Sequence, residues 1–326
     1  VITPEAAWPN IHMVEVVRSC PELCKFCLAS YLTLPFRPAS FQEGLIPAVE
    51  KGLKATKRLG LLGASVTQHP EFTNLMEWLN KDQFDNIHLS ISSVRASTVN
   101  KQLAEILTKR GGKSLTIAIE SGSERLRTVI NKKLTQEEIF AAAKYAKEGG
   151  LSSLKLYGMI GLPTEEATDI DATADLLISL KQKNPGLRLT LGVSTFVPKA
   201  HTPFQWHGVR TESKKYLRYL AKTLKPKGIQ LRPESFGWSI IQALISRSDR
   251  RLAKVISLMR SSQNSLGEWK KAYRTIREEA ETNETRPPGW EEVIHNSWDK
   301  SRVLPWSHLE GPLKKEQLII HEEQAI

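Results

Sequence analysis

Cysteine is scarce in this sequence of 326 residues, which contains only Cys20, Cys24 and Cys27. A disulfide framework needs an even number of cysteines and an oxidising compartment, and three clustered thiols meet neither requirement. A structural zinc site normally has four protein ligands, so the fourth ligand here would have to be one of eight scattered histidines. The sequence also lacks an apolar run of the roughly 18–20 residues that cross a bilayer. Its beginning shows no charged and then apolar signal segment.

Acidic residues are outnumbered by basic ones, and the formal net charge is +11. The basic residues lie within helical patterns, such as residues 51–58, 213–227 and 246–254, and form no continuous run. No aromatic residue alternates with them at the intervals that stack nucleic-acid bases. We therefore interpret them as solvated helix faces. The overall charge balance still favours an anionic substrate.

Apolar segments alternate with amphipathic ones over the first two thirds of the chain. Strands are expected at residues 11–17, 59–66, 84–94, 114–121, 151–163 and 188–198, with helices between them. Strands that are apolar on both faces indicate a parallel sheet covered by helices, and consecutive units of this kind close into a full or partial barrel. The sequence thus predicts an α/β fold with a partial (β/α)6 TIM-like barrel over residues 1–205. Residues 206–326 are expected to form a mainly helical C-terminal extension.

The spacing of the three cysteines points to an iron–sulfur site. A cubane cluster is usually held by four thiolates, so three leave one iron with an open coordination position. The cysteine loop directly follows the first predicted strand, and barrels place their chemistry at the carboxyl ends of the strands. An iron with an open position is more useful there as a reaction centre than as a passive electron relay.

The stretch CPELCKFC at residues 20–27 resembles the fingerprint of the radical S-adenosylmethionine (radical SAM) superfamily, with Phe26 just before the last cysteine. The resemblance implies a radical SAM type of barrel and a 4Fe-4S cluster on Cys20, Cys24 and Cys27. The amino and carboxylate groups of S-adenosylmethionine (SAM) would chelate the fourth iron, and an electron would split SAM into methionine and a 5′-deoxyadenosyl radical. It also implies a reductant such as flavodoxin or ferredoxin. Reduced thiols and an oxygen-sensitive cluster predict a cytoplasmic protein.

The stretch LLGAS at residues 61–65 takes the place of the superfamily's glycine-rich motif after the second strand. The resemblance implies that the backbone of Gly63 and Ala64 receives the amino group of SAM. The usual acidic third residue is replaced by Ser65, which leaves no side-chain contact to expect there. A small-residue strand end packed beneath a helix is the alternative interpretation.

Residues 117–135, IAIESGSERLRTVINKKLT, resemble the fourth-strand motif of the branch that contains methylthiotransferases and cobalamin-dependent enzymes. The resemblance implies that Glu120 and Ser121 contact SAM and that Lys132 pairs with a carboxylate. Burying a glutamate at the end of an apolar strand is costly unless it has a partner. An exposed lysine at a helix end is the alternative for Lys132.

The later part of the chain narrows the resemblance to an uncharacterised family of cobalamin-binding-domain-type radical SAM proteins. Residues 196–206, 242–252 and 304–318 carry it, and the first of these implies that the backbone of Val197 and Pro198 lines the adenine side of SAM. That family usually has an N-terminal cobalamin-like domain. This chain has no Asp-x-His-x-x-Gly motif and begins with Val instead of Met. We therefore expect an upstream segment, and cobalamin only through a domain that is not in this chain.

The cysteine count restricts the reaction. Methylthiotransferases need a second three-cysteine cluster, enzymes with auxiliary clusters need cysteines in the C-terminal extension, and RNA methylation through a methyl-cysteine needs further thiols. Hydrogen abstraction and cobalamin-linked methyl transfer on an unknown substrate remain. A non-catalytic iron–sulfur or RNA-binding adaptor is the alternative, and a zinc-binding structural module is a third. The tryptophans of the extension are interpreted as core anchors: Trp238, Trp269, Trp290, Trp298 and Trp306.

Overall fold

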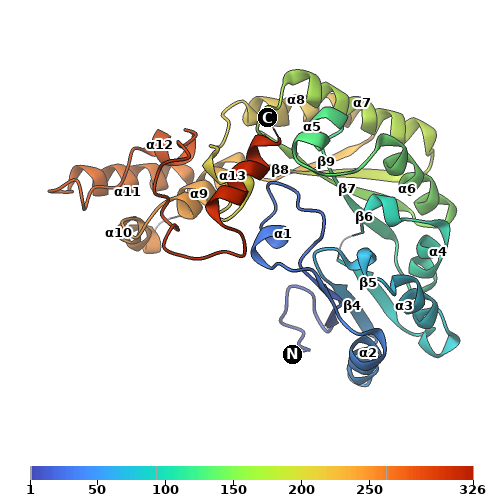
Figure 1. Cartoon of the computed structure of the whole chain (residues 1–326). Coiled ribbons are helices and arrows are strands. Elements are labelled where there is room, and N and C mark those ends of the chain that lie inside the picture. Colours follow the sequence, from blue (N-terminus) through green and yellow to red (C-terminus); the bar gives the residue numbers. More distant parts are fainter. Residues whose placement is uncertain (1, 93, 262, 326) are drawn as a thin grey trace.

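A computed structural model describes residues 2–92, 94–261 and 263–325 of the chain (Figure 1). Within these residues a three-stranded sheet in the order β1-β4-β5 and a four-stranded sheet in the order β6-β7-β8-β9 are both parallel. An isolated parallel bridge between Val94 and Ile117 joins them. The strands are β1 (His12–Glu15), β4 (Arg58–Leu62), β5 (His88–Ile91), β6 (Ser114–Glu120), β7 (Ser153–Ile160), β8 (Arg188–Thr195) and β9 (Gln230–Pro233).

Neighbouring strands follow one another in chain order, as they do in a β/α barrel. In the described ranges no pairing joins β9 to β1, so the sheet is curved and open on that side. This confirms the predicted α/β fold of the partial-barrel kind. Residue 93, inside the strand predicted at 84–94, lies outside the described residues.

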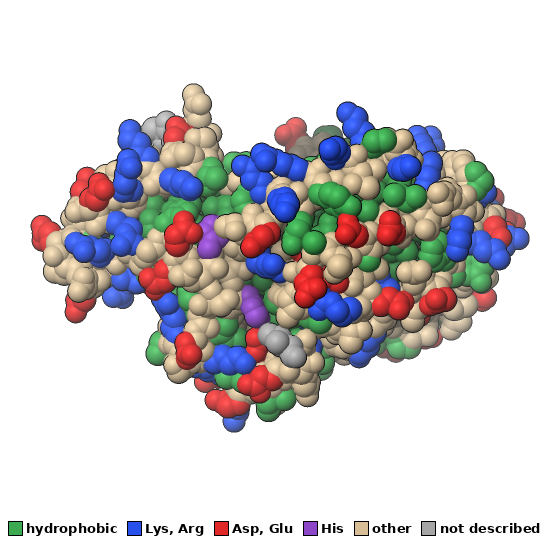
Figure 2. Space-filling model, turned by 90° about the horizontal axis from the view of Figure 1, so that it is seen from above, with side chains coloured by type: hydrophobic (Ala, Val, Ile, Leu, Met, Phe, Trp, Pro, Cys, Tyr) green, Lys and Arg blue, Asp and Glu red, His purple; other side chains and the backbone are tan. Residues whose placement is uncertain are grey.

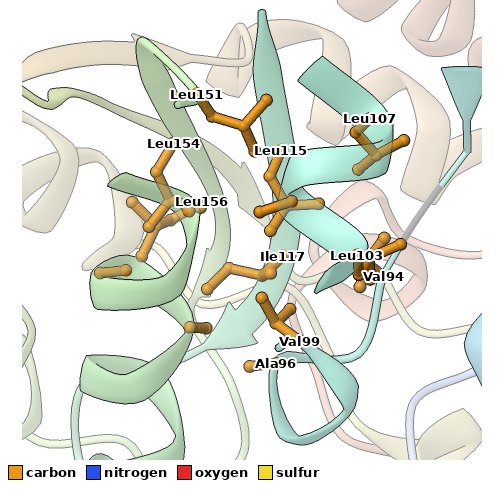
Figure 3. Packing of buried hydrophobic residues seen from close by; sticks show 14 of the residues in the cluster. Val94, Ala96, Val99, Leu103, Leu107, Leu115, Ile117, Leu151, Leu154 and Leu156 are labelled. Atoms are coloured by element: carbon orange, nitrogen blue, oxygen red, sulfur yellow. The ribbon is translucent and has the colours of Figure 1, made fainter. Parts of the chain in front are cut away.

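The helices that connect the strands cover the convex face of the sheet (Figure 1). Leu103 and Leu107 of α4 share one hydrophobic cluster with Leu115 and Ile117 of β6, and Figure 3 shows these side chains facing one another. The side chain of Asn100 accepts a hydrogen bond from the Leu103 N–H at 2.8 Å, which begins α4 at that point. The covering helices are α2 (Ile46–Leu53), α3 (Phe72–Leu79), α4 (Lys101–Lys109), α6 (Gln136–Glu148), α7 (Ala167–Lys183) and α8 (Ser213–Leu224).

The β/α alternation continues beyond the end that the sequence predicts. The expectation that it stops near residue 206 is wrong, because α8 and β9 follow β8 and add another parallel strand to the sheet. This strand has four residues, is mostly exposed and ends in Pro233, so it lacks the apolar run by which the other strands were recognised. The strand-bearing part of the chain therefore extends past the boundary expected at residues 205 and 206.

The C-terminal helices form a second packed unit beside the sheet. Ile240 and Leu244 of α9 cluster with Val255 of α10, Trp269 of α11 and Ile294 of α12. Among the described residues no helix combines the length and apolar character needed to cross a membrane. The helices of this part are α9 (Phe236–Arg247), α10 (Leu252–Leu258), α11 (Leu266–Glu278), α12 (Trp290–Ile294) and α13 (Lys315–Glu323).

The last helix returns to the N-terminal part of the chain. Tyr31 in α1 (Leu28–Leu32) is buried against Leu318 of α13 and against Trp298 and Trp306. Its hydroxyl lies 3.1 Å from Nδ1 of His321. Helix α13 therefore packs directly against α1, the helix that follows the cysteine loop (Figure 1).

Candidate active site

The three cysteines line one cavity of about 170 Å³ at the carboxyl ends of the parallel strands. They lie in the loop between β2 (Val17–Arg18) and α1, which also supplies Phe26 to the wall. The wall is completed by residues that follow other strands. These are Ala64 and Ser65 after β4, Val94 and Arg95 after β5, and Glu120 and Lys132 from the end of β6 and the loop beyond α5 (Glu124–Val129).

A second loop holds the cysteine loop in place. The thiol of Cys24 lies 3.6 Å from the carbonyl oxygen of Asn131. The side-chain amide of Asn131 donates to the carbonyl oxygens of Glu22 at 2.9 Å and Leu23 at 3.0 Å. Asn131 has a φ of +56°, a left-handed conformation that asparagine tolerates better than most residues. The backbone of the cysteine loop is thereby fixed to the segment that also carries Lys132.

Burial governs the chemistry of the central thiol. Cys24 is 6% exposed, and this burial raises the pKa of its thiol to about 12, although Lys132 opposes the rise. Such a thiol is protonated and unreactive by itself, and a bound metal cation reverses this by stabilising the thiolate. Cys20 and Cys27 are half-buried, and all three cysteines are free of disulfides.

The three thiols can be compared with the donors that a cluster and a single metal ion require. Over the described part of the chain, no three His, Cys, Asp or Glu side chains converge as the ligands of one metal ion do. In an iron–sulfur cubane each cysteine binds a different iron, so the sulfur atoms lie around the cluster instead of around one point. The three thiols that line one cavity are the donor set that such a cluster requires.

Glu120 and Lys132 form an ion pair inside the cavity. The Nζ of Lys132 lies 2.9 Å from Oε1 of Glu120, and the two side chains are 13% and 12% exposed. Burial opposes the charge of Lys132, but the Glu120 carboxylate outweighs it and raises the pKa of the lysine. Lys132 is therefore buried and paired with a carboxylate of the chain itself, so the exposed helix-end alternative is wrong, and its contact with SAM stays a prediction.

The backbone aims Glu120 into the cavity. The pairing of β6 with β7 shifts register between Ala118 and Glu120, as in a β-bulge, and Glu120 has a φ of +62°. A bulge re-aims a side chain out of the regular alternation of a strand. A positive φ is uncommon for a glutamate, and such conformations cluster at functional sites.

A second ion pair of the cavity was missed by the sequence reasoning. Glu22 and Arg95 lie 3.2 Å apart, and their side chains are mostly buried. The side-chain amide of Gln68 donates to Glu22 at 2.5 Å and is itself hydrogen-bonded to Ser65. Two signals in the sequence could have revealed this pair. Glu22 lies inside the cysteine motif, and Arg95 follows the third parallel strand, where barrels collect functional residues.

Gly63 allows the loop after β4 to lie close to the backbone of β2. A Cβ atom at this position would lie 2.7 Å from the carbonyl oxygen of Val17, so only glycine lets the loop after β4 approach β2 this closely. Its neighbour Ala64 reaches the cavity wall.

Other expected SAM contacts lie away from the cavity wall. Ser121 is buried, and its hydroxyl accepts the Ser123 N–H at 3.1 Å. Val197 packs with the helices of the C-terminal extension, and Pro198 beside it is buried. Among described residues the wall does not include Gly63, Ser121, Val197 or Pro198, so their contacts with SAM stay predictions.

Comparison with models of protein families identifies the family of this chain. A family model described as the radical SAM superfamily matches residues 14–177, which run from β1 into α7 and include the cysteine loop and both ion pairs. The chain belongs to the radical SAM superfamily. The recognition made from the cysteine motif is therefore confirmed.

Individual relatives of this radical SAM chain are similar over different lengths. The uncharacterized protein MJ0966 of Methanocaldococcus jannaschii is 34% identical over 269 residues, which cover 82% of this chain and 59% of that protein. The uncharacterized methyltransferase PH0819 of Pyrococcus horikoshii is 28% identical over 171 residues, covering 49% and 35% respectively. The chain thus matches about three fifths or less of the length of these curated relatives.

Solved structures share the fold, and one of them illustrates the likeness. This structure is that of the radical SAM methyltransferase TsrM from Kitasatospora setae, with cobalamin and a 4Fe-4S cluster bound. The match has a TM-score of 0.51 at 12% identity and covers 62% of this chain and 42% of TsrM. At this identity the likeness supports the fold and leaves the reaction to be argued from the site.

Proposed function

We propose that this radical SAM protein holds a 4Fe-4S cluster through Cys20, Cys24 and Cys27 and cleaves SAM reductively. The observation that supports the proposal is which of the possible iron ligands around the cavity already have an ionic partner. Its carboxylates are already engaged by cations, Glu22 by Arg95 and Glu120 by Lys132. The three thiols form no disulfide, and Lys132, whose charge acts on Cys24, is itself paired with Glu120. The thiols are therefore the donors left for iron.

When bound, the cluster supplies the electron that splits SAM into methionine and a 5′-deoxyadenosyl radical. The chain's own residues give the cavity its polarity. The Glu120–Lys132 and Glu22–Arg95 pairs present both signs of charge, and the amino-acid part of SAM carries an ammonium and a carboxylate. An existing ion pair can accept a zwitterion by exchanging partners, which keeps every buried charge compensated. Phe26 and Leu134 give the wall its apolar part and exclude water there.

The test is anaerobic reconstitution with iron and sulfide, followed by reduction with dithionite in the presence of SAM. We expect a brown protein that releases 5′-deoxyadenosine. Cys24→Ala should lose both the colour and the product, since two thiolates do not retain a cubane. Ser30→Ala is the matched control: Ser30 lines the same cavity, and its buried hydroxyl has no hydrogen-bond partner in the described part of the chain. A cluster that leaves SAM intact would indicate the adaptor, and bound zinc the structural module.

Methyl transfer is the reaction class that the comparisons favour. PH0819, similar over half of this chain, is named a methyltransferase, and TsrM shares the fold. We infer that cobalamin, if the reaction uses it, is bound by a domain outside this chain and that a flavodoxin or ferredoxin supplies electrons. Product analysis decides between the two chemistries. Radical methyl transfer yields S-adenosylhomocysteine in addition to 5′-deoxyadenosine and methionine, because one SAM donates the methyl group and a second supplies the radical. Hydrogen abstraction without methyl transfer yields 5′-deoxyadenosine and methionine alone.

A further inference from the structure

A groove of about 790 Å³ lies on the C-terminal helical unit, at the end of the molecule away from the sheet (Figure 1). One wall is α11 and the other is the segment at residues 286–290 that leads into α12. Figure 2 shows Lys and Arg side chains over this end of the molecule, with Asp and Glu side chains interspersed. Five basic side chains and a single carboxylate, Glu278, line the groove; the basic ones are Lys270, Lys271, Arg274, Arg277 and Arg286.

The basic side chains of the groove are poorly neutralised. Among the described residues, Lys270 and Lys271 have no acidic partner within ion-pair distance. Arg274 lies 4.0 Å from Glu278, but both side chains are about 70% exposed, and such pairs contribute little. A buried nitrogen of Arg277, Nη1, has no hydrogen-bond acceptor in the described structure. Cations held close together without acids repel one another, and an anionic ligand would relieve this repulsion.

Two arginines of the same extension that lie outside the groove do have acidic partners. Arg251 forms an ion pair with Asp249 at 2.5 Å, and Arg302 one with Glu292 at 2.8 Å. These two arginines are neutralised locally, in contrast to Lys270 and Lys271 of the groove.

An aromatic surface accompanies these charges. Trp290 is half-buried, and its ring meets Tyr273 edge to face with centroids 5.5 Å apart. The Lys270 ammonium lies 5.6 Å from the centroid of the Trp290 ring. The Tyr273 hydroxyl donates to the carbonyl oxygen of Pro288 at 2.9 Å, which ties the second wall to α11. Trp290 thus anchors the helices, as the sequence predicts, and also lines the groove.

We propose that this groove binds a single-stranded nucleic acid, with phosphates on the basic side chains and a base against Trp290. Basic grooves with exposed aromatic rings hold single strands in this manner. The basic residues run from Lys270 to Arg277, about 10 Å along the helix axis at 1.5 Å per residue. That length suits successive phosphates of one strand better than the single phosphate of a modified peptide. The site is separate from the cysteine cavity and does not depend on the proposed reaction.

The experiment titrates the reconstituted chain of 326 residues with fluorescent oligouridylate and oligodeoxythymidylate at several salt concentrations. For about four phosphate contacts on a single strand we expect a slope of log K against log salt of about −3. The double variant Lys271→Ala/Arg274→Ala should reduce the slope to about −1.5 and weaken binding by about 25-fold near 0.1 M salt. Lys222→Ala on α8 is exposed and outside the groove, and should match the unmodified chain.

Trp290→Leu separates stacking from charge, because it should weaken binding while leaving the salt slope unchanged. The proposal is overturned if the double variant and Lys222→Ala bind alike, or if a phosphoserine peptide or inorganic polyphosphate binds more tightly than either oligonucleotide. Melting curves of each variant show whether a loss reflects unfolding, and Lys271→Ala alone then replaces any variant that does not fold. The titration contains neither SAM nor reductant, so its result is independent of SAM cleavage.

Discussion

Replacing Lys132 with methionine should destabilise the protein far more than a typical lysine substitution. The change keeps most of the side-chain volume but leaves the carboxylate of Glu120, 12% exposed, without the ammonium that lies 2.9 Å away. Removing one partner of a buried ion pair costs about 3–5 kcal/mol, because the remaining charge is desolvated and uncompensated. Because both side chains keep some exposure to solvent, we expect a loss of unfolding free energy at the lower end of this range, about 3 kcal/mol.

The assay is urea unfolding of the reconstituted chain of 326 residues near neutral pH. Lys101→Met is the matched control, because Lys101 also pairs with a glutamate, Glu105 at 3.5 Å, but both side chains are more than half exposed. Breaking an exposed pair of this kind costs about 0.5 kcal/mol. The double variant Lys132→Met/Glu120→Gln removes both charges and should be more stable than Lys132→Met alone. This closes a double-mutant cycle that isolates the energy of the pair.

Equal unfolding midpoints for Lys132→Met and Lys101→Met would refute the reasoning. They would mean that water screens the Glu120 carboxylate as well as it screens Glu105, so the cavity would not be desolvated. A double variant less stable than Lys132→Met would also contradict the argument, because it would show that the unpaired carboxylate is not the source of the loss.

Three further outcomes are expected. Glu120→Ala should weaken SAM binding, measured by equilibrium dialysis, and leave the brown colour intact; unchanged affinity would remove Glu120 from the site. Gly63→Ala should lower both the urea midpoint and the iron content, because its methyl would meet a carbonyl oxygen at 2.7 Å, whereas Gly44→Ala meets nothing closer than 3.8 Å and should be tolerated. Burial raises the pKa of Glu165 from 4.5 to about 8, so the folded state binds the proton more tightly than the unfolded state. The contribution of protonated Glu165 to the free energy of unfolding is fully present below pH 4.5. It decreases as the pH rises towards 8, by up to about 5 kcal/mol. Urea midpoints of Glu165→Gln should therefore fall less than those of the unmodified chain between pH 5 and pH 8, and parallel curves would contradict this.

Several features of the site were predictable because they depend on local sequence. The cysteines follow an apolar β-branched segment, so the position of their loop at a strand end could be read directly. Glu120 ends the strand predicted at residues 114–121, and its place in an apolar run signalled a buried carboxylate with a partner. The structure confirms both placements, with Glu120 ending β6 and paired with Lys132.

Other features depend on which segments meet in space, and sequence patterns carry little of that information. Glu22 and Arg95 come from loops after different strands, so nothing local in the sequence links them. Trp238 was expected in the core with the other tryptophans of the extension, but it is 55% exposed, so that interpretation is wrong for this residue. It lies on α9 between positions that do face the core, and an isolated tryptophan does not reveal which helix face is covered.

The sequence by itself determined the place of the cysteine loop at a strand end and the parallel β/α order, and the resemblance of its cysteine motif predicted the radical SAM superfamily, because these are properties of short segments. The tertiary structure alone decided that Lys132 neutralises Glu120, that Arg95 neutralises Glu22, and that α13 packs against the helix after the cysteine loop. It also decided that the basic residues of α11 face a second wall across a groove. The physical reason is that burial and charge compensation are set by the convergence of strand ends and helices that lie far apart in the chain.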